Sequence, residues 1–329
     1  MNIIKFFMIC SLLFVVSLSS FASVKPIIVF SEQVDYAKNV ARAFTQKTGV
    51  PVIVMKIQGS GDAIVRLEGE QKLITADVWF GGGVGAHGQA YEQGLIEPYK
   101  SKLSEQLIPA FRDPLGGYIT NGLYVGILGF GVNKKVLRRR NSDLPETWND
   151  LLKGELRALV GMKNPMLSGT AYTTIATLIA LKGEDAAFNY IKKLNDNIWE
   201  YTIGQSERVR RGDIGVAITY LHEFSGANRK PAVEFIFPKD GTSYEVGGIS
   251  LVKASKQKEL AKRFIDFALS HEGQMLKYFS NWQLSTNKAT AKLKREYQDL
   301  PKLVPLDFSY FGKNRARLVA KWHQTVFKN

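Results

Sequence analysis

Short apolar runs alternate with amphipathic stretches along most of this chain. In the first hundred residues, apolar runs at Ile27 to Phe30, Val50 to Ile57 and Ala76 to Phe80 predict three strands. The intervening stretches, Asp35 to Thr48 and Asp62 to Gly69, predict helices. Strands and helices that alternate with short turns predict a parallel sheet covered by helices on both faces, with right-handed crossovers.

The alternation starts again after a longer extended run at Tyr124 to Asn133. Further strands are predicted at Ala158 to Met162, Ile214 to Leu221 and Gly247 to Val252. Further helices are predicted from Asn149 to Lys153, Thr170 to Lys182, Lys258 to Leu269 and in the tail from Thr290. We therefore expect an α/β protein of two lobes, joined by extended crossing segments and separated by a ligand cleft.

The N-terminus has the features of an export signal. Lys5 precedes an apolar run from Phe6 to Val16, and Ser20-Phe21-Ala22 supplies small residues at the two positions that a signal peptidase reads. The run is short for a membrane span and precedes a small-residue site. We predict cleavage after Ala22 and a soluble protein in the periplasm; the alternative is an uncleaved anchor.

Cysteine content restricts the chemistry of the mature chain. The single cysteine, Cys10, lies within the predicted signal and is removed with it. Disulfides, thiolate metal sites and cysteine catalysis are thereby excluded from the mature protein.

The charge balance favours an anionic partner. The chain has 44 Lys and Arg against 30 Asp and Glu, a formal net charge of +14, and such an excess steers anions toward the protein. The positive residues are scattered, with clusters only at Arg138-Arg139-Arg140 and Arg208-Val209-Arg210-Arg211. No basic-aromatic stripe or nucleic-acid motif accompanies them. Among nucleic acid, anionic membrane and small anion, we expect a small anionic solute and no nucleic acid.

Four turns stand at predicted strand ends or helix starts. In open α/β sheets, ligands bind beyond the carboxyl ends of strands, against the N-termini of the following helices. Glycine permits close backbone approach, and hydroxyls and free amides donate hydrogen bonds, so these turns suit a phosphate or carboxylate. Each turn alone also fits ordinary turn chemistry. The turns are Ser31, Gly59-Ser60-Gly61, Gly81-Gly82-Gly83 and Leu167-Ser168-Gly169-Thr170.

Several motifs in a specific order resemble extracellular solute-binding proteins of the ferric-iron type, a family that also includes phosphonate, thiamine and sugar-phosphate carriers. The strongest is Asn164-Pro165-Met166-Leu167-Ser168-Gly169-Thr170-Ala171-Tyr172. Gly59-Ser60-Gly61, Ala76 to Gly83, Leu251-Val252-Lys253 and Ser270 to Gln274 fit the same family, and the resemblance covers nearly the whole mature chain.

The resemblance implies the two-lobed type II periplasmic-binding fold. Residues 1–22 would form the signal peptide, 23–125 with 245–284 the first lobe, and 126–244 with 285–329 the second. It also implies a carrier, expected to be a monomer without a cofactor or bound metal, which closes on its solute and delivers it to the membrane permease of an ABC importer.

The segment after the second-lobe strand distinguishes iron from other solutes. Ferric carriers of this family present two adjacent tyrosines there, whereas this chain has Tyr220 followed by Leu221, His222 and Glu223. A His beside an acid, with a Glu about two dozen residues later, resembles the sugar-phosphate branch, in which these groups hold sugar hydroxyls; here they are His222, Glu223 and Glu245. The branch more often has Asp where Glu223 stands.

These assignments predict a division of labour in the cleft. The anionic group would contact Ser31, Gly59, Ser60, Gly61, Gly82, Gly83, Ser168, Gly169 and Thr170, and the hydroxyls would contact His222, Glu223 and Glu245. The alternatives are a ferric-iron carrier, a phosphonate or other organophosphate carrier, and a surface role for His222 and Glu223. A hydrolase with Ser168 as nucleophile is disfavoured, because that serine lies outside any Gly-x-Ser-x-Gly elbow.

Overall fold

The computed structural model describes residues 25–69, 76–202, 204–224, 231–279, 283–291 and 301–327. The predicted signal peptide, Cys10 and the cleavage point at Ala22 lie outside these ranges. Among the described residues, no helix has the length and apolar character needed to cross a bilayer.

Eleven strands form one continuous sheet within the described residues, in the order β2-β1-β3-β10-β5-β8-β6-β7, with β4, β9 and β11 pairing beside this path. Their bounds are β1 (Ile27–Ser31), β2 (Val52–Lys56), β3 (Val78–Gly83), β4 (Ile96–Glu97), β5 (Asn121–Asn133), β6 (Val160–Met162), β7 (Ile198–Tyr201), β8 (Val216–Tyr220), β9 (Val233–Ile236), β10 (Tyr244–Val252) and β11 (Leu284–Ser285).

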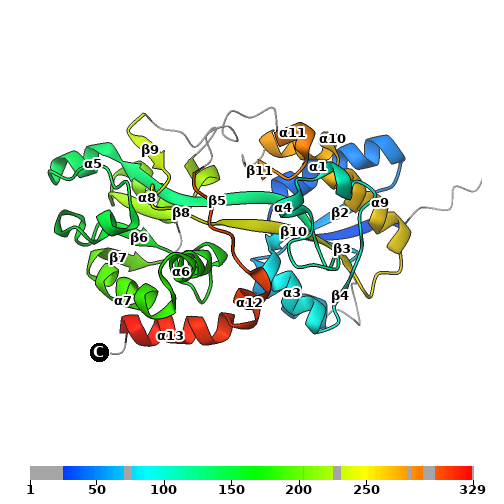
Figure 1. The fold of residues 1–329 in the computed structure, drawn as a ribbon. Coiled ribbons are helices and arrows are strands. Elements are labelled where there is room, and N and C mark those ends of the chain that lie inside the picture. The colour runs from blue at the N-terminus through cyan, green and yellow to red at the C-terminus, as the bar shows by residue number, and fades with distance from the viewer. Residues whose placement is uncertain are drawn as a thin grey trace, which may run out of the picture.

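The α-helices lie on both sides of this sheet (Figure 1). Their bounds are α1 (Val34–Thr48), α2 (Ser60–Gly69), α3 (Val84–Glu92), α4 (Pro109–Arg112), α5 (Lys134–Arg139), α6 (Gly169–Lys182), α7 (Glu184–Leu194), α8 (Gln205–Arg211), α9 (Lys258–Leu269), α10 (His271–Met275), α11 (Lys288–Ala291), α12 (Phe308–Lys313) and α13 (Arg315–Phe327).

Short 3-10 helices complete the elements. They are Ser104–Gln106, Trp148–Leu152, Gly154–Leu156, Asn195–Asn197, Leu221–Phe224 and Leu276–Phe279. The helix predicted at Asn149 to Lys153 is one of these short turns, because the residue after it, Lys153, already has extended backbone angles.

The long strand β5 connects the two halves of the sheet. From Asn121 to Ile127 it pairs with β10, and from Leu128 to Asn133 it pairs with β8 and β9. Both β5 and β10 run between the blue-cyan and green halves of the molecule (Figure 1). These two strands are therefore the crossing segments that the extended run at Tyr124 to Asn133 predicted.

The sheet is mixed, and the predicted parallel arrangement holds only for its two outer groups of strands. The outer groups β2-β1-β3 and β7-β6-β8 are parallel, as their strand-helix alternation predicted. The two crossing strands are antiparallel to each other and to their other neighbours in the sheet. A chain that crosses between halves and returns reverses its direction, which a local strand-helix pattern does not reveal.

Each half has its own hydrophobic core. One core surrounds Phe44, Phe80 and Phe264, and the other surrounds Phe130, Trp148 and Trp322. Both are closely packed; Phe130 and Trp148, for example, meet edge to face with ring centroids 5.0 Å apart. Two separate cores joined by two strands provide a geometry in which the halves can move relative to each other.

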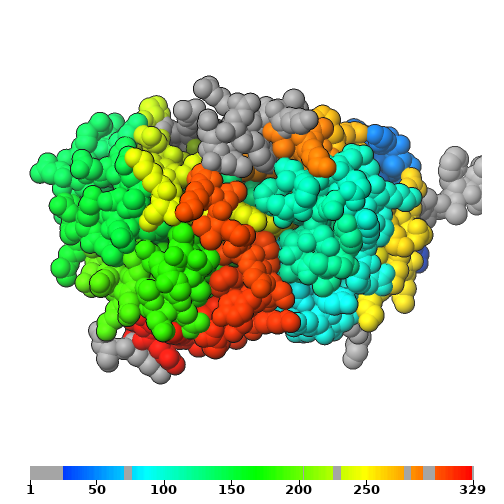
Figure 2. Space-filling model, in the orientation of Figure 1, coloured from blue at the N-terminus to red at the C-terminus, as the bar shows by residue number. Residues whose placement is uncertain are grey.

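The C-terminal segment lies over the junction of the two halves. In Figure 2 its orange and red surface lies between the green and cyan halves. Phe308 of α12 packs against both the core around Trp148 and a smaller cluster that contains Val84 and Val246. The C-terminal segment therefore contacts both halves of the molecule.

Candidate functional site

The first predicted turn places the carboxylate of Glu32 beside the turn that follows β2. Ser31, at the end of β1, is fully buried, and its hydroxyl accepts a hydrogen bond from the Gln33 N–H at 2.9 Å. This bond stabilises the bend that carries Glu32. The Glu32 carboxylate lies next to the turn after β2, where a Cβ on Gly59 would stand 3.7 Å from Glu32 Oε2.

The glycine turn after β3 is a place of close approach. Gly81 and Gly82 have φ angles of +91° and +88°, which side chains with a Cβ rarely adopt. The Gly82 N–H donates to the Tyr124 hydroxyl at 3.1 Å, and a Cβ on Gly82 would stand 2.7 Å from Ser60 Oγ. Ser60 and Gly82 of the predicted anion site therefore lie side by side.

Glu245 connects this turn to the second half of the molecule. A Cβ on Gly83 would overlap Glu245 Oε1, and a Cβ on Gly169 would stand 3.3 Å from the same oxygen. Gly83 begins α3 and Gly169 begins α6, so the carboxylate lies between the N-termini of two helices from different halves.

His222 and Tyr220 lie on the same face as Glu245. In the β5–β10 pair Glu245 stands opposite Gly126, and residues directly opposite project to the same face. A Cβ on Gly126 would stand 3.2 Å from the Tyr220 ring and 3.4 Å from His222 Cε1. The Tyr220 hydroxyl forms hydrogen bonds with Glu245 and, at 3.0 Å, with Thr173. The structure thus brings His222 and Glu245 together, as expected from the sequence.

The N-terminus of α6 is the strongest candidate for anion binding. Ser168 caps this helix and accepts a hydrogen bond from the Ala171 N–H at 3.4 Å. Gly169 is exposed and Thr170 is largely buried. A helix of 14 residues presents free N–H groups and a partial positive charge at this end.

Glu223 is held by protein groups. Its Oε1 pairs with Lys163 Nζ at 2.7 Å, and its Oε2 accepts a hydrogen bond from Ser206. Burial alone would raise the pKa of Glu223, but the opposing effects of Lys163, His222 and Ser206 are larger and lower it to about 2. Glu223 is therefore ionised at neutral pH, and its oxygens retain lone pairs for ligand hydroxyls.

His222 is a half-buried, neutral imidazole. Burial lowers its pKa to about 4, against the attraction of Glu223. Its Nδ1 is buried and has no hydrogen-bond partner in the described part of the chain. A buried polar atom without a partner is unfavourable, which is consistent with a ligand atom completing this site.

The acids of the first half behave differently. Burial, and then the charge of Glu245, raise the pKa of Glu32 to about 7. Burial also raises the pKa of Glu245, although Tyr220, Arg315 and Lys163 oppose the increase. The pKa of the Tyr124 hydroxyl is raised by burial and by both carboxylates. Ionising the second of these acids is therefore unfavourable in the free protein.

Two cations of the site escaped the sequence analysis. Lys163 follows β6 directly, so the strand-end rule that selected Ser168 could have selected it. Arg315 begins α13; its guanidinium donates to the Pro165 carbonyl at 3.2 Å and lies 4.5 Å from the Tyr172 ring centre. Burial lowers the pKa of Arg315, and no local pattern pointed to it, because its partners are 150 and 143 residues away.

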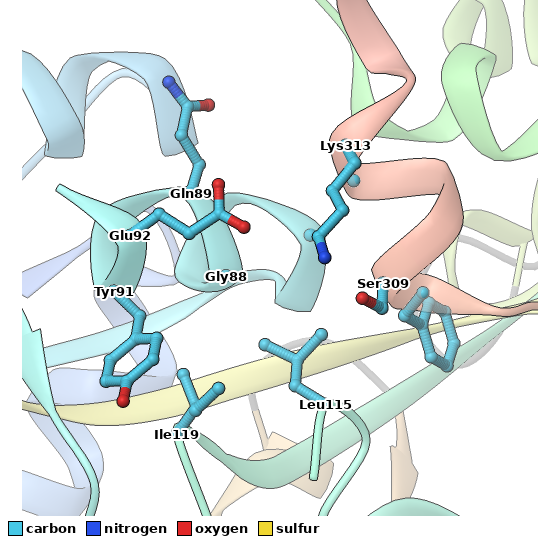
Figure 3. A pocket seen from close by; sticks show the side chains of 11 residues that line it. Gly88, Gln89, Tyr91, Glu92, Leu115, Ile119, Ser309 and Lys313 are labelled. Atoms are coloured by element: carbon cyan, nitrogen blue, oxygen red, sulfur yellow. The ribbon is translucent and has the colours of Figure 1, made fainter. Parts of the chain in front are cut away.

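A pocket of about 230 Å³ lies elsewhere, between α3 and α12 (Figure 3). Glu92 and Lys313 lie on opposite sides of it, with Leu115 and Ile119 below. It contains none of the residues predicted to bind a ligand, and it is smaller than the roughly 300 to 1,000 Å³ typical of ligand pockets. The turns around Glu245 therefore remain the candidate site.

Comparison with known proteins agrees with this fold. Residues 74–314 match the family model described as bacterial extracellular solute-binding protein. The chain therefore belongs to this family, whose members are not enzymes and deliver small solutes to a membrane permease.

One similar protein is the periplasmic binding protein AfuA from Actinobacillus pleuropneumoniae, with fructose-6-phosphate bound. It is 36% identical, superimposes with a TM-score of 0.84, and the match covers 93% of this chain and 99% of that one. An uncharacterised protein of Haemophilus influenzae is 37% identical over 297 residues, 87% of this chain and 86% of its own length. Iron uptake protein A1 of Synechocystis is more distant, 26% identical over 80% of this chain and 78% of its own.

Proposed function

We propose that this chain captures a small phosphorylated solute, a sugar phosphate, for an ABC importer. The observation that supports this most is the convergence of Glu245 with His222 and with the N-termini of α3 and α6. Charged and neutral acceptors for hydroxyls thus stand next to helix N-termini suited to a phosphate. AfuA, with a sugar phosphate bound, is similar in sequence and fold over nearly the whole chain.

The phosphate would lie at the N-terminus of α6. Gly169 is open there, Ser168 and Thr170 carry hydroxyls, and Arg315 lies beside the same turn through its bond to Pro165. The helix end and the guanidinium would both stabilise a doubly charged group. From the first half, Ser60 and the backbone of the turns around Gly59, Gly61, Gly82 and Gly83 would complete the enclosure.

The sugar hydroxyls would contact His222, Glu223 and Glu245. The unpartnered Nδ1 of His222 and the remaining lone pairs of the two carboxylates provide the acceptors and donors. Closure would occur by rotation of the two halves about β5 and β10, and the closed halves would bury a small ligand between them.

The remaining features of the carrier follow the same proposal. Its lobes would be 23–125 with 245–284, and 126–244 with 285–329. We further propose that the leader is cleaved after Ala22, that the mature protein works in the periplasm as a monomer, and that it binds no nucleic acid.

A thermal-shift screen of the mature protein tests the proposal. The protein is unfolded and refolded to remove bound solute, then mixed with fructose 6-phosphate, glucose 6-phosphate, an aminoalkyl phosphonate, inorganic phosphate or ferric citrate. At about 100 times its Kd a ligand stabilises by roughly 2.7 kcal/mol, a shift of several degrees for this length. Stabilisation by the sugar phosphates supports the proposal. Stabilisation by ferric citrate alone would refute it in favour of an iron carrier, and by the phosphonate alone in favour of a phosphonate carrier.

A further inference from the structure

Two carboxylates and a phenol gather at the turns after β1, β2 and β3, on the first-half side of the proposed cleft. Glu32 lies against Gly59, Glu245 lies against Gly83, and the Tyr124 hydroxyl lies at Gly82. Neither Glu32 nor Glu245 forms a salt bridge with any residue in the described ranges. The end of the cleft that joins β1, β3 and β10 is therefore rich in hydrogen-bond acceptors.

A second observation concerns His222, which the second half contributes to the same site. His222 lies on the face toward which Glu245 projects, and its buried Nδ1 has no partner within the described residues. The imidazole is neutral, since burial holds its pKa near 4. It therefore does not compensate the negative charge of the carboxylates.

Cations stand on the second-half side, where Arg315 and Lys163 lower the pKa of Glu245 against the effect of burial. Arg315 lies next to the turn before α6, and Lys163 is bound to Glu223. The first half contributes a buried cation as well: Lys277 Nζ donates to the Leu284 carbonyl at 3.0 Å, lies 5.7 Å from the Tyr36 ring centre and acts electrostatically on His222. Among these groups Glu32 is the acid whose pKa no cation lowers, since only burial and Glu245 act on it.

We propose that the solute carries a protonated amine in addition to its phosphate, and that Glu32 is a specificity-determining residue that accepts this amine together with Glu245. The favoured ligand class is then an amino sugar phosphate, with its phosphate at α6 and its ammonium between the two carboxylates. This inference rests on the proposed function and adds the chemical group that the first-lobe acids recognise.

An ammonium suits this position better than a hydroxyl. Two carboxylates close together repel when both are ionised, and the raised pKa of Glu32 reflects this repulsion and its burial. An ammonium between them favours both charges and donates up to three hydrogen bonds. Near neutral pH, Glu32 then loses its proton to the solvent as the ligand binds, so binding releases a proton to the buffer.

The test compares two solutes that differ in one group. Glucosamine 6-phosphate carries an ammonium where glucose 6-phosphate carries a hydroxyl. Isothermal titration calorimetry on the refolded mature protein at pH 7.5 gives both affinities, and titrations in buffers of different ionisation enthalpy give the protons released. We expect the amine to bind at least tenfold more tightly, with proton release. In Glu32→Gln the preference should fall below threefold and the proton release should disappear.

Matched controls separate this inference from the general function. Glu68→Gln changes an exposed carboxylate of α2 and should leave preference and proton release unchanged. Equal or weaker binding of the amine by the wild-type protein, or a preference that survives in Glu32→Gln, would overturn the inference while sugar-phosphate capture stands. If neither sugar binds, phosphoethanolamine is compared with ethyl phosphate. An amine preference in that pair supports the role of Glu32 without a sugar, and its absence overturns both proposals.

Discussion

Glu223 in the second half of the molecule and Glu32 in the first are both half-buried acids, yet their pKa values move in opposite directions. Lys163 and Ser206 hold Glu223 and lower its pKa to about 2. Glu32 lacks a cation in the described part of the chain, and burial and Glu245 raise its pKa to about 7. Within the fold the charge of Glu223 is balanced by Lys163, whereas the charge of Glu32 is left for a ligand to balance.

This contrast separates stability from recognition. A carboxylate paired with a cation inside the protein stabilises the folded state, and its ionisation changes little when a solute binds. A carboxylate without a paired cation destabilises the free protein. A cationic group on the solute would remove this cost when it binds, so the affinity depends on which solute occupies the site. Removing each acid should therefore have opposite effects on the free protein.

The largest expected effect follows from Glu223→Ala. The substitution leaves the half-buried Lys163 without its partner; because breaking a fully buried pair costs about 3 to 5 kcal/mol and an exposed pair contributes up to about 1 kcal/mol, we expect a loss of about 2 to 3 kcal/mol. Chemical denaturation at pH 7 measures the loss in unfolding free energy. Asp213→Ala removes an exposed partner of Arg211 and should change stability by less than about 1 kcal/mol. Equal losses of unfolding free energy in the two variants would show that the ion pair of Glu223 and Lys163 does not stabilise the folded protein.

Glu32→Gln should stabilise the free protein, with a dependence on pH. The folded-state pKa of Glu32 is raised from 4.5 to about 7, so the folded state holds the proton more tightly and stability declines as pH rises through this interval. Above pH 7 the wild type is weakened by up to about 3 kcal/mol relative to a neutral side chain. The variant should be more stable than wild type at pH 8 and equal to it at pH 4. A stability loss at pH 8 would contradict the comparison.

Arg315→Met should weaken ligand binding while leaving most of the stability in place. The methionine preserves packing on Tyr172 but removes the guanidinium beside α6, and a hydrogen bond to a charged group contributes about 1.5 to 3 kcal/mol. Titration calorimetry should show a 10- to 100-fold weaker affinity for a sugar phosphate. Unchanged affinity would place the phosphate away from α6.

The smallest effect concerns the cap of α6. Ser168→Ala removes the hydroxyl that accepts the Ala171 N–H and should cost about 1 kcal/mol, whereas Ser168→Gly should cost only a few tenths. Thermal unfolding of the free proteins measures both. If the two variants are equally stable, Ser168 does not act as a cap.

The sequence predicted the elements that depend on local pattern. The helix at Lys258–Leu269 has the predicted bounds, and α1 and α6 begin one residue earlier than predicted. The four turns at strand ends and the His222–Glu223 pair were also found from local residues, since strand ends and glycine turns have distinct signatures.

The features that were missed depend on long-range contacts. The antiparallel course of β5 and β10 arises from strands more than a hundred residues apart. The sequence analysis assigned Ser31, and not its neighbour Glu32, to the binding site. The burial of Glu32 and its proximity to Glu245 arise only when the chain folds. Arg315 was missed for the same reason, because its partners Pro165 and Tyr172 are far from it in the sequence.

The pKa values of Glu32 and Glu223 test the contrast between the lobes most directly. Side-chain carboxyl ¹³C chemical shifts, assigned with Glu32→Gln and Glu223→Gln and followed against pH, report each group in the free and the solute-saturated protein. We predict about 7 for Glu32 in the free protein, with a fall on saturation, and about 2 for Glu223 in both states. Values near 4.5 for both groups, or a Glu32 value that does not change when a solute binds, would contradict the account.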